Sequence, residues 1–395
     1  MKIGIFSEVT IYNPPFPSGV SRFFREITTQ LVKRGHEIVI FEPKTYIKQP
    51  KIEKIKNKIT TYRPFSVRWT NYSNYPICFP LKEIFLGIPF DLDIVHANHI
   101  GMGIFAATTS WKRQIPRIIS YHTPLIHYLN YIPLPLFFFR SKKLVNFFIR
   151  LSYHRFGLTI VPTQGVKNEL IRRGFKGPFG FFPTCLDLQN LPKPSTKDLD
   201  VFRQKYNLNG KKIVLFVGRM SPEKGVNQIL YLIPAILKKE PNTHFLMVGT
   251  GPFLEYYKEL TEKKDLNGNV TFTGYVSDFD LFTAISIANL GLIFVNKAQI
   301  FDMTILEYWN YGLPLVIRRA MGIEEIVIDN ETGLLFNNLK EAKNKILALL
   351  QNKNLSDRIS ENCKRTVEQK YDIKKCIIIL ERLYRRCAED YYNSS

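Results

Sequence analysis

The sequence predicts an α/β protein made of two domains, each a parallel sheet wrapped by helices. Its 395 residues exceed what one ordinary hydrophobic core holds. Short apolar runs alternate with helical patterns in both halves of the chain, which is typical of parallel sheets with crossover helices. An irregular proline-rich stretch, residues 181–195, separates the halves. We therefore expect one domain over residues 1–190, a second over 191–372, and a C-terminal helix over 373–395 that closes the second domain or crosses back onto the first.

The predicted strands are short apolar runs in both halves. In the first half they are residues 3–6, 37–41, 94–96, 118–121 and 159–162. In the second half they are residues 212–217, 243–248, 270–273 and 290–295. A helix over residues 21–34 connects the first two strands, because Phe24, Ile27 and Leu31 recur at helical spacing and Gly35 follows as a C-terminal cap.

Neither secretion nor a membrane span is predicted. The apolar run from Met1 to Phe6 is too short for a signal peptide, and Glu8 follows it. No stretch approaches the roughly 20 apolar residues that cross a bilayer. The 5 cysteines are scattered without a C-x-x-C spacing, so neither a disulfide framework nor a zinc site is indicated. We expect a cytoplasmic protein.

The chain is strongly basic. Its formal net charge is +21, from 55 Lys and Arg against 34 Asp and Glu, which favours a polyanionic partner such as nucleic acid, anionic lipid or a phosphorylated substrate. The charge is uneven, because residues 112–176 hold 12 basic residues and a single acidic one, Glu169. Nucleic acid is the least favoured partner, since none of the usual reader modules is recognisable.

The strongest local signal runs from Val217 to Gly225 and reads V-G-R-M-S-P-E-K-G. It lies directly after a predicted strand and before a helical pattern. A strand-to-helix turn offers free backbone N–H groups and the positive end of a helix dipole, and Arg219 and Lys224 add two cations. This combination suits a diphosphate. The alternative is a solvated loop with two ordinary surface cations.

This segment resembles the G-R-x-S-x-E-K-G motif of the retaining GT-B glycosyltransferases of family four, also described as the glycosyltransferase group 1 type. Other landmarks of that family occur in its order along the chain. They are Pro17-Ser18-Gly19-Val20, Arg34-Gly35-His36-Glu37, Asp93-Ile94-Val95-His96, Ser120-Tyr121-His122-Thr123, Val248-Gly249-Thr250-Gly251-Pro252, Val270-Thr271-Phe272-Thr273-Gly274-Tyr275 and Glu331-Thr332-Gly333-Leu334-Leu335. The resemblance covers nearly the whole chain. It implies two Rossmann-like domains with a cleft between them, the first on the acceptor side and the second binding the nucleotide sugar.

The resemblance also implies roles for single residues. Arg219 and Lys224 are implied to neutralise the donor diphosphate as its charge grows, which is usually the largest catalytic contribution. His122 is implied to be the third catalytic residue, contacting the donor sugar from the end of a strand, although a lone histidine is more often a core residue. The implied donor-binding residues are Gly19, Gly218, Arg219, Lys224, Tyr275, Gln299 and Glu307.

The chain departs from the family pattern in its E-x7-E element. Glu307 matches the second glutamate, which is implied to hold the ribose hydroxyls, but Gln299 stands in place of the first. Asp302 replaces the usual glycine between them. Because Gln299 keeps hydrogen-bonding capacity and loses charge, we expect altered donor preference or rate, with loss of activity as the competing interpretation.

No metal or cofactor is expected. Three D-x-D triplets, beginning at Asp91, Asp198 and Asp278, suggest a metal-bound diphosphate of the GT-A kind. Each lies where we expect a loop or a helix start, and the two cations make a metal unnecessary.

The first predicted domain, on the acceptor side, has aromatic residues next to basic ones in its sequence. Residues 121–131 and the pair Tyr75-Pro76 resemble a branch of the family that includes diacylglycerol glucosyltransferases, sulfolipid synthases and GDP-mannose-dependent mannosyltransferases. The candidates for contact with a membrane or an acceptor are Tyr128, Phe138, Arg140, Lys142, Lys143 and Arg150. The alternative is a crossover helix with buried aromatics and a solvated basic face.

The sequence thus predicts a metal-independent, retaining transfer of a hexose from a UDP- or GDP-sugar to a lipid or lipid-linked glycan. We expect the protein to lie peripherally on the cytosolic face of a membrane. Acceptors that are soluble glycans or polysaccharides are the nearest alternative. A catalytically impaired GT-B partner subunit is another, motivated by Gln299 and Asp302.

Overall fold

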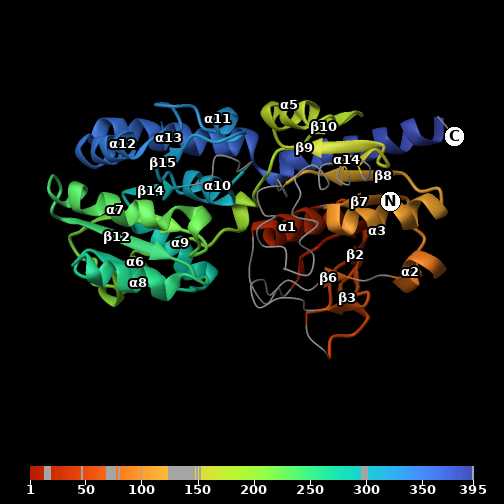
Figure 1. Cartoon of the computed structure of the whole chain (residues 1–395), viewed down its shortest axis with the longest axis horizontal. Coiled ribbons are helices and arrows are strands. Elements are labelled where there is room, and N and C mark those ends of the chain that lie inside the picture. The colour runs from red at the N-terminus through yellow and green to blue at the C-terminus, as the bar shows by residue number, and fades with distance from the viewer. Residues whose placement is uncertain are drawn as a thin grey trace. The chain divides into compact units, whose positions relative to one another are not determined.

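A computed structural model describes residues 1–12, 19–45, 48–67, 77–78, 81–98, 100–122, 147, 150, 153–294 and 301–393. The chain divides into two compact units. Unit 1 comprises Met1–Leu186 together with Ile373–Ser395, and unit 2 comprises Asp187–Asp372 (Figure 1). The C-terminal helix therefore belongs to the same unit as the N-terminus.

Unit 1 is built on an 8-stranded sheet with the order β10-β9-β8-β7-β1-β2-β4-β3. Its strands are β1 (Lys2–Phe6), β2 (Glu37–Phe41), β3 (Ile52–Lys56), β4 (Ile59–Tyr62), β7 (Ile94–Ala97), β8 (Arg117–Ser120), β9 (Leu158–Val161) and β10 (Phe179–Phe181). All neighbours pair in parallel except β3, which pairs antiparallel with β4 at the edge. A separate antiparallel pair joins β5 (Ser66–Val67) to β6 (Ile77–Cys78).

The following helices of unit 1 lie within the described residues. They are α1 (Gly19–Lys33), α2 (Leu81–Leu86), α3 (Ile100–Lys112), α5 (Gln164–Arg172) and α14 (Ile373–Asn393). Helix α14 is held to the rest of the unit by Glu381, which lies 2.8 Å from both the Arg34 guanidinium and His36 Nε2. The Tyr384 hydroxyl and His96 Nδ1 form a further hydrogen bond of 2.8 Å. Three polar contacts thus fix the C-terminal helix against the turn after α1 and against β7.

Unit 2 is built on a 6-stranded parallel sheet with the order β13-β12-β11-β14-β15-β16. Its strands are β11 (Lys212–Val217), β12 (Thr243–Val248), β13 (Val270–Gly274), β14 (Leu290–Ile293), β15 (Leu315–Arg318) and β16 (Leu334–Phe336). Its helices are η3 (Leu188–Asn190), α6 (Thr196–Lys205), η4 (Pro222–Lys224), α7 (Val226–Leu237), α8 (Leu254–Lys263), α9 (Asp278–Ile287), α10 (Met303–Asn310), α11 (Ile323–Ile326), α12 (Leu339–Gln351) and α13 (Lys353–Lys370).

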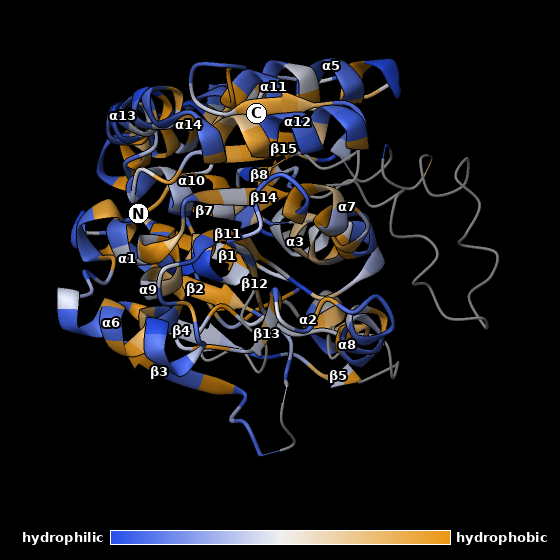
Figure 2. Ribbon diagram, turned by 90° about the vertical axis from the view of Figure 1, so that its left-hand side faces the viewer, coloured by the Kyte–Doolittle hydropathy of each residue, from blue (hydrophilic) through white to orange (hydrophobic). Residues whose placement is uncertain are grey.

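Each unit has its own core, made by strands that are covered on both faces. Ile3, Ile5, Val214 and Leu215 are fully buried, as expected for strands of a parallel sheet between two layers of helices. In Figure 2 strands such as β2 and β15 are largely hydrophobic, whereas helices such as α12 have both hydrophilic and hydrophobic stretches. Burial of this apolar surface is the main stabilising contribution to each unit.

The predicted fold class is confirmed: both units are Rossmann-like α/β layers. Predicted strands agree with the observed ones within about two residues wherever the chain is described, and Gly35 takes φ +94° just after α1. The strands β3, β4, β5, β6, β10, β15 and β16 were not predicted. Within the described residues no helix combines the length and the apolar character that a bilayer crossing needs.

Candidate functional site

The parallel sheet of unit 2 has a topological switch point, which lies at the edge formed by the carboxyl ends of its strands. The chain proceeds from β11 to β12 and β13 on one side of the sheet, and from β14 to β15 and β16 on the other. Ligands of open α/β sheets bind where the strand order reverses, which here is the point between β11 and β14. The motif from Val217 to Gly225 follows β11 at this point.

The loop after β11 is braced by the loop after β12. The Gly218 N–H donates to the Val248 carbonyl at 3.0 Å, and the Met220 N–H donates to the Thr250 carbonyl at 3.0 Å. Gly249 has φ +131°, and a Cβ there would collide with the Gly218 carbonyl oxygen. Any larger residue at Gly249 would therefore push the two loops apart, which explains why glycine stands there.

The turn then leads into α7 through the short helix η4. Ser221 Oγ lies 2.7 Å from Glu223 Oε1, and the Gly225 N–H donates to the Pro222 carbonyl at 3.1 Å. Gly225 takes the left-handed conformation with φ +67°, where a side chain would also meet Phe294. This conformation sets the direction of α7 and so positions the Lys224 side chain at the switch point.

Arg219 and Lys224, the two predicted cations, occupy different surroundings. The Arg219 side chain is exposed, and within the described part of the chain it has no hydrogen bond or ion pair. Lys224 is only 23% exposed, and its Nζ lies 2.8 Å from Asp302 Oδ2. One cation is thus available to solvent, whereas the other is already paired.

Asp302 also caps α10. Its side chain accepts a hydrogen bond of 3.2 Å from the Thr304 N–H at the start of that helix, and only 11% of it is exposed. Burial acts to raise the pKa of Asp302, but the Lys224 ammonium and the bonds from Thr304 outweigh it and hold the pKa below its ordinary value. Asp302 is therefore ionised at neutral pH.

The other predicted donor residues of unit 2 that the structure describes lie just after strands or, for Glu307, on helix α10. Glu307 is buried on α10, and Tyr275 is exposed directly after β13. Gly218 is half-buried after β11. Gln299 lies outside the described residues, so its predicted contact with the donor sugar stays a prediction.

Sequence reasoning missed Arg318, a further cation at the end of β15. Its guanidinium lies 5.7 Å from the centroid of the Phe294 ring and 5.6 Å from that of Phe336, and it donates to Gln228 Oε1 at 2.6 Å. Phe294 in turn borders Gly225. Burial lowers the pKa of Arg318, which still remains charged. The only hint in the sequence was a pair of arginines directly after the apolar residues 315–317, which were not predicted as a strand.

His122 lies just beyond the carboxyl end of β8, as predicted. The rings of Phe23 and Phe24 on α1 pack edge-on against it, with centroids 5.3 and 5.8 Å away. His96 lies below it on β7 and bonds to Ser120 Oγ at 2.7 Å. Burial lowers the pKa of His96 to about 3, so that residue is neutral.

Gly19 is exposed at the first position of α1, the helix that carries the two phenylalanines next to His122. The structure therefore brings Gly19 and His122 to the same end of unit 1. Arg219, Lys224, Glu307 and Tyr275 lie in unit 2.

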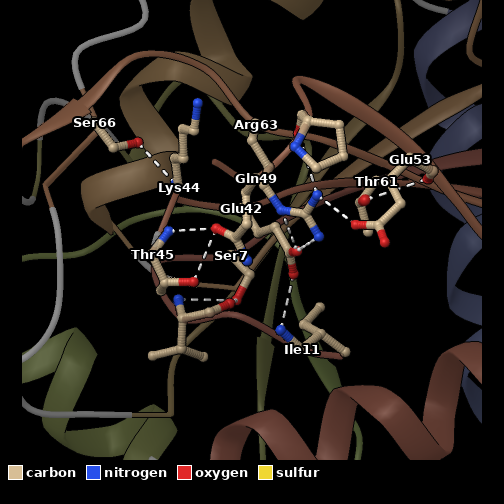
Figure 3. Close-up of polar contacts among 12 residues, drawn as sticks. Ser7, Ile11, Glu42, Lys44, Thr45, Gln49, Glu53, Thr61, Arg63 and Ser66 are labelled. Atoms are coloured by element: carbon tan, nitrogen blue, oxygen red, sulfur yellow. Dashed lines mark hydrogen bonds and ion pairs between the residues drawn. The ribbon is translucent and has the colours of Figure 1, made fainter. Parts of the chain in front are cut away.

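A buried ion pair that the sequence did not predict lies at the carboxyl end of β2. Figure 3 shows Glu42 between Ile11 and Arg63. Glu42 accepts from the Ile11 N–H at 2.9 Å and from Arg63 at 2.9 and 3.1 Å, and both side chains are almost fully buried. Arg63 also reaches Glu53 at 2.6 Å. Since Ile11 belongs to the loop between β1 and α1, this pair anchors the chain that leads to Gly19.

Most of the predicted membrane candidates lie outside the described residues, namely Tyr128, Phe138, Arg140, Lys142 and Lys143. Arg150 is described; it is exposed, and its guanidinium borders Gly174 at the end of α5. Other large apolar side chains of unit 1 are also exposed. They include Phe85 on α2 and Trp111 on α3, which are 74% and 70% exposed.

The three D-x-D triplets lie where expected. Asp91 is in the loop before β7, Asp198 belongs to the capping box of α6, and Asp278 begins α9 behind its cap Ser277. Among the described residues, no three His, Cys, Asp or Glu side chains gather in a way that could hold a metal ion.

Two family models match this chain, one on each unit. The Glycosyltransferase Family 4 model matches residues 17–190, and the Glycosyl transferases group 1 model matches residues 198–366. The chain belongs to these glycosyltransferases. The fold is accordingly GT-B, and the general activity is glycosyl transfer.

Relatives of this glycosyltransferase include enzymes named for glycolipid synthesis. It is 24% identical over 374 residues to the alpha-monoglucosyldiacylglycerol synthase of Acholeplasma laidlawii, covering 92% of this chain and 91% of the relative. It is 25% identical over 382 residues to the sulfoquinovosyl transferase SQD2 of Arabidopsis thaliana, covering 94% of this chain and 71% of that one.

A solved structure shares the fold. The crystal structure of Anabaena HepE, determined in complex with UDP-glucose, superimposes with a TM-score of 0.75 at 20% identity. The match covers 97% of this chain and 99% of that structure. The likeness supports the same two-unit architecture for both proteins.

Proposed function

We propose that this glycosyltransferase transfers a hexose, with retention of configuration, from a UDP- or GDP-sugar to a lipid or lipid-linked glycan. The transfer takes place without a metal, on the cytosolic face of a membrane to which the protein binds peripherally. The observation that carries the donor assignment is the pair Arg219 and Lys224 at a braced strand-to-helix turn at the switch point of unit 2. Backbone N–H groups and two cations are what a leaving diphosphate requires.

The proposed roles are those that the family resemblance implies. Arg219 and Lys224 neutralise the diphosphate, Glu307 binds the ribose hydroxyls, and Tyr275 borders the donor. His122, at the end of β8 in unit 1, contacts the donor sugar, and Gly19 leaves room for the backbone to approach. Gln299 is proposed to contact the sugar.

A lipid acceptor is supported by the relatives named for glycolipid synthesis and by large apolar side chains that are exposed on unit 1. The strong basic charge of the chain favours an anionic partner. Phe85 and Trp111 are exposed to a degree that is unusual for such large side chains, and cations lie nearby at Lys82 and Arg113. Aromatic groups with adjacent cations are the composition that interfacial binding to anionic membranes requires.

The donor assignment is tested with the full chain and a panel of UDP- and GDP-sugars. Binding of free UDP and GDP is measured by calorimetry, and transfer is then measured with diacylglycerol and membrane lipid extracts as acceptors. We expect one nucleoside diphosphate to bind and one sugar to be transferred, with the anomeric configuration of the product equal to that of the donor. Absence of nucleotide binding under all conditions refutes the proposal, and an inverted product refutes the retaining mechanism.

A second candidate function is that of a catalytically impaired partner subunit. Two observations favour it. Lys224, one of the two proposed catalytic cations, is already paired with Asp302. Gln299 also stands where the family motif has glutamate. The two functions differ in one measurement. An impaired subunit binds nucleotide without transferring or hydrolysing any sugar donor, whereas the enzyme turns over.

The membrane proposal is tested by co-sedimentation with vesicles. The test variant replaces the cations of the basic segment with glutamine, at Arg140, Lys142, Lys143 and Arg150. The control variant removes the same charge from exposed lysines of unit 2, at Lys238, Lys239, Lys263 and Lys264. Each cation near an anionic surface contributes about 1 kcal/mol. We expect the test variant alone to lose most binding to anionic vesicles, and wild-type binding to weaken as salt rises. Equal, salt-insensitive sedimentation of all three proteins refutes the proposal.

A further inference from the structure

We propose that Asp302 tunes the donor site by competing with the donor diphosphate for Lys224, so that it weakens the hold of the site on nucleoside diphosphates. This inference rests on the proposed function, because it takes the anion at Arg219 and Lys224 to be a diphosphate. The inference gives a role to Asp302, which stands where the family motif has glycine.

The geometry places the Asp302 carboxylate on the groups that a phosphate would use. Its Oδ2 lies 2.8 Å from Lys224 Nζ, and its Oδ1 accepts from the Thr304 N–H at 3.2 Å. A lysine ammonium and an N–H at the start of a helix are both donors that bind phosphate oxygens. The carboxylate thus serves as an internal anion in the unliganded protein.

The position of Asp302 makes this effect strong. The side chain is only 11% exposed and Lys224 only 23%, so solvent screens the pair weakly. A diphosphate that approaches Lys224 is attracted by the ammonium and repelled by the carboxylate next to it. Arg219, exposed at the other end of the turn, supplies attraction without such an opposing charge.

A consequence for the reaction follows from this charge balance. After transfer, the leaving nucleoside diphosphate carries more negative charge than the donor did, so a nearby carboxylate repels the product more strongly than the substrate. Asp302 therefore favours product release, and removing its charge should retain the product.

A purely structural role predicts a different outcome, and one substitution separates the two. Asn caps helices about as well as Asp, so Asp302→Asn keeps the start of α10 while it removes the charge. If Asp302 acts only as a helix cap, nucleotide affinity stays at the wild-type value. If it competes for Lys224, affinity rises.

The experiment measures the Kd of UDP and GDP for the full chain by calorimetry, at low and at high salt. We expect Asp302→Asn to bind the preferred nucleotide roughly tenfold more tightly than wild type at low salt, with a smaller gain at high salt. The control is Asp198→Asn, which removes the same charge from another helix start of unit 2, in the capping box of α6. That variant should match wild type.

A double-mutant cycle tests the link to Lys224. In the Lys224→Ala background, Asp302→Asn should gain much less than it does in wild type, because the shared partner is gone. Unchanged or weaker binding in Asp302→Asn overturns the inference while the proposed function stands. If neither wild type nor any variant binds nucleotide, the proposed function itself fails, and the inference fails with it.

Discussion

The buried carboxyl of Glu42 allows a test in which burial and the ion pair with Arg63 predict pH dependences of stability with opposite signs. Burial raises the pKa of Glu42 from the ordinary 4.5 to about 7, against the Ile11 N–H and Arg63, which lower it. A carboxyl with a raised pKa in the folded state binds a proton there more readily than in the unfolded chain. Its contribution to stability is therefore fully present below pH 4.5 and is lost as the pH rises through 7.

The magnitude follows from the two pKa values. Their difference corresponds to about 3 kcal/mol of unfolding free energy lost between pH 4.5 and pH 8. Glu42→Gln cannot titrate, so it removes this pH dependence. The variant loses one of the two acceptor oxygens that bond Ile11 and Arg63, so it is less stable than wild type, and its own stability does not vary with pH through this side chain. Its deficit relative to wild type should therefore shrink by about 3 kcal/mol as the pH rises.

Calorimetric unfolding from pH 4.5 to 8 measures this change. For a unit of this size, 3 kcal/mol shifts Tm by about 6–12 °C. The matched control is Glu83→Gln. Burial acts to raise the pKa of Glu83 too, but bonds from Tyr62 and Lys51 outweigh it, and the pKa is lowered. For Glu83 the stabilisation is present above pH 4.5 and lost as the pH falls, so the deficit of that variant should grow with pH.

Parallel curves for wild type and Glu42→Gln would refute the reasoning about burial. A deficit that grows with pH would show that the Arg63 ion pair dominates and that the pKa of Glu42 is depressed instead. Because the chain has two compact units, limited proteolysis followed by mass spectrometry assigns the affected transition to one of them.

Three further predictions concern the donor site. Arg219→Ala and Lys224→Ala should each lower kcat/KM by on the order of a hundredfold, because each removes a charge partner of the leaving diphosphate; near-wild-type turnover of both variants in a steady-state transfer assay contradicts the site. Glu307→Ala should weaken binding of the free nucleoside diphosphate and leave kcat nearly unchanged, since ribose hydroxyls change little in the transition state; an unchanged Kd contradicts this. Gln299→Glu should fold normally and change the relative rates of a panel of sugar donors, and identical relative rates would show that this position does not contact the sugar.

The parts of the protein that could be predicted from sequence are those that depend on near neighbours in the chain. The strand before Gly218 and the helix after Gly225 are encoded by a contiguous apolar run and by helical spacing, and the turn between them is a local motif. The edge strand β3 was missed because Ile52–Lys56 is mostly charged and exposed, so its pairing with β4 is determined by the adjacent sheet and not by its own apolar pattern.

Side-chain pairs between distant segments could not be predicted in this way. Glu42 and Arg63 are 21 residues apart, and Lys224 and Asp302 are 78 apart. Each pair forms because the parallel topology brings the carboxyl ends of different strands to one edge, which a single sequence does not encode in any local pattern. Asp302 was visible as a departure from a family motif and Lys224 as a motif cation, but their pairing was not predicted.

The pairing of Lys224 changes how the two cations of the donor site can act. Arg219 is exposed and free to meet an incoming anion, while Lys224 must exchange one carboxylate for another anion before it can contribute. Such an exchange leaves the number of ion pairs formed by Lys224 unchanged, so its net contribution to ground-state binding is small. In the transition state the leaving diphosphate gains charge and the exchange becomes more favourable, because the Asp302 carboxylate keeps its single charge. For the proposed donor site we therefore expect Lys224 to contribute mainly to the rate of bond cleavage, and Arg219 to capture of the donor.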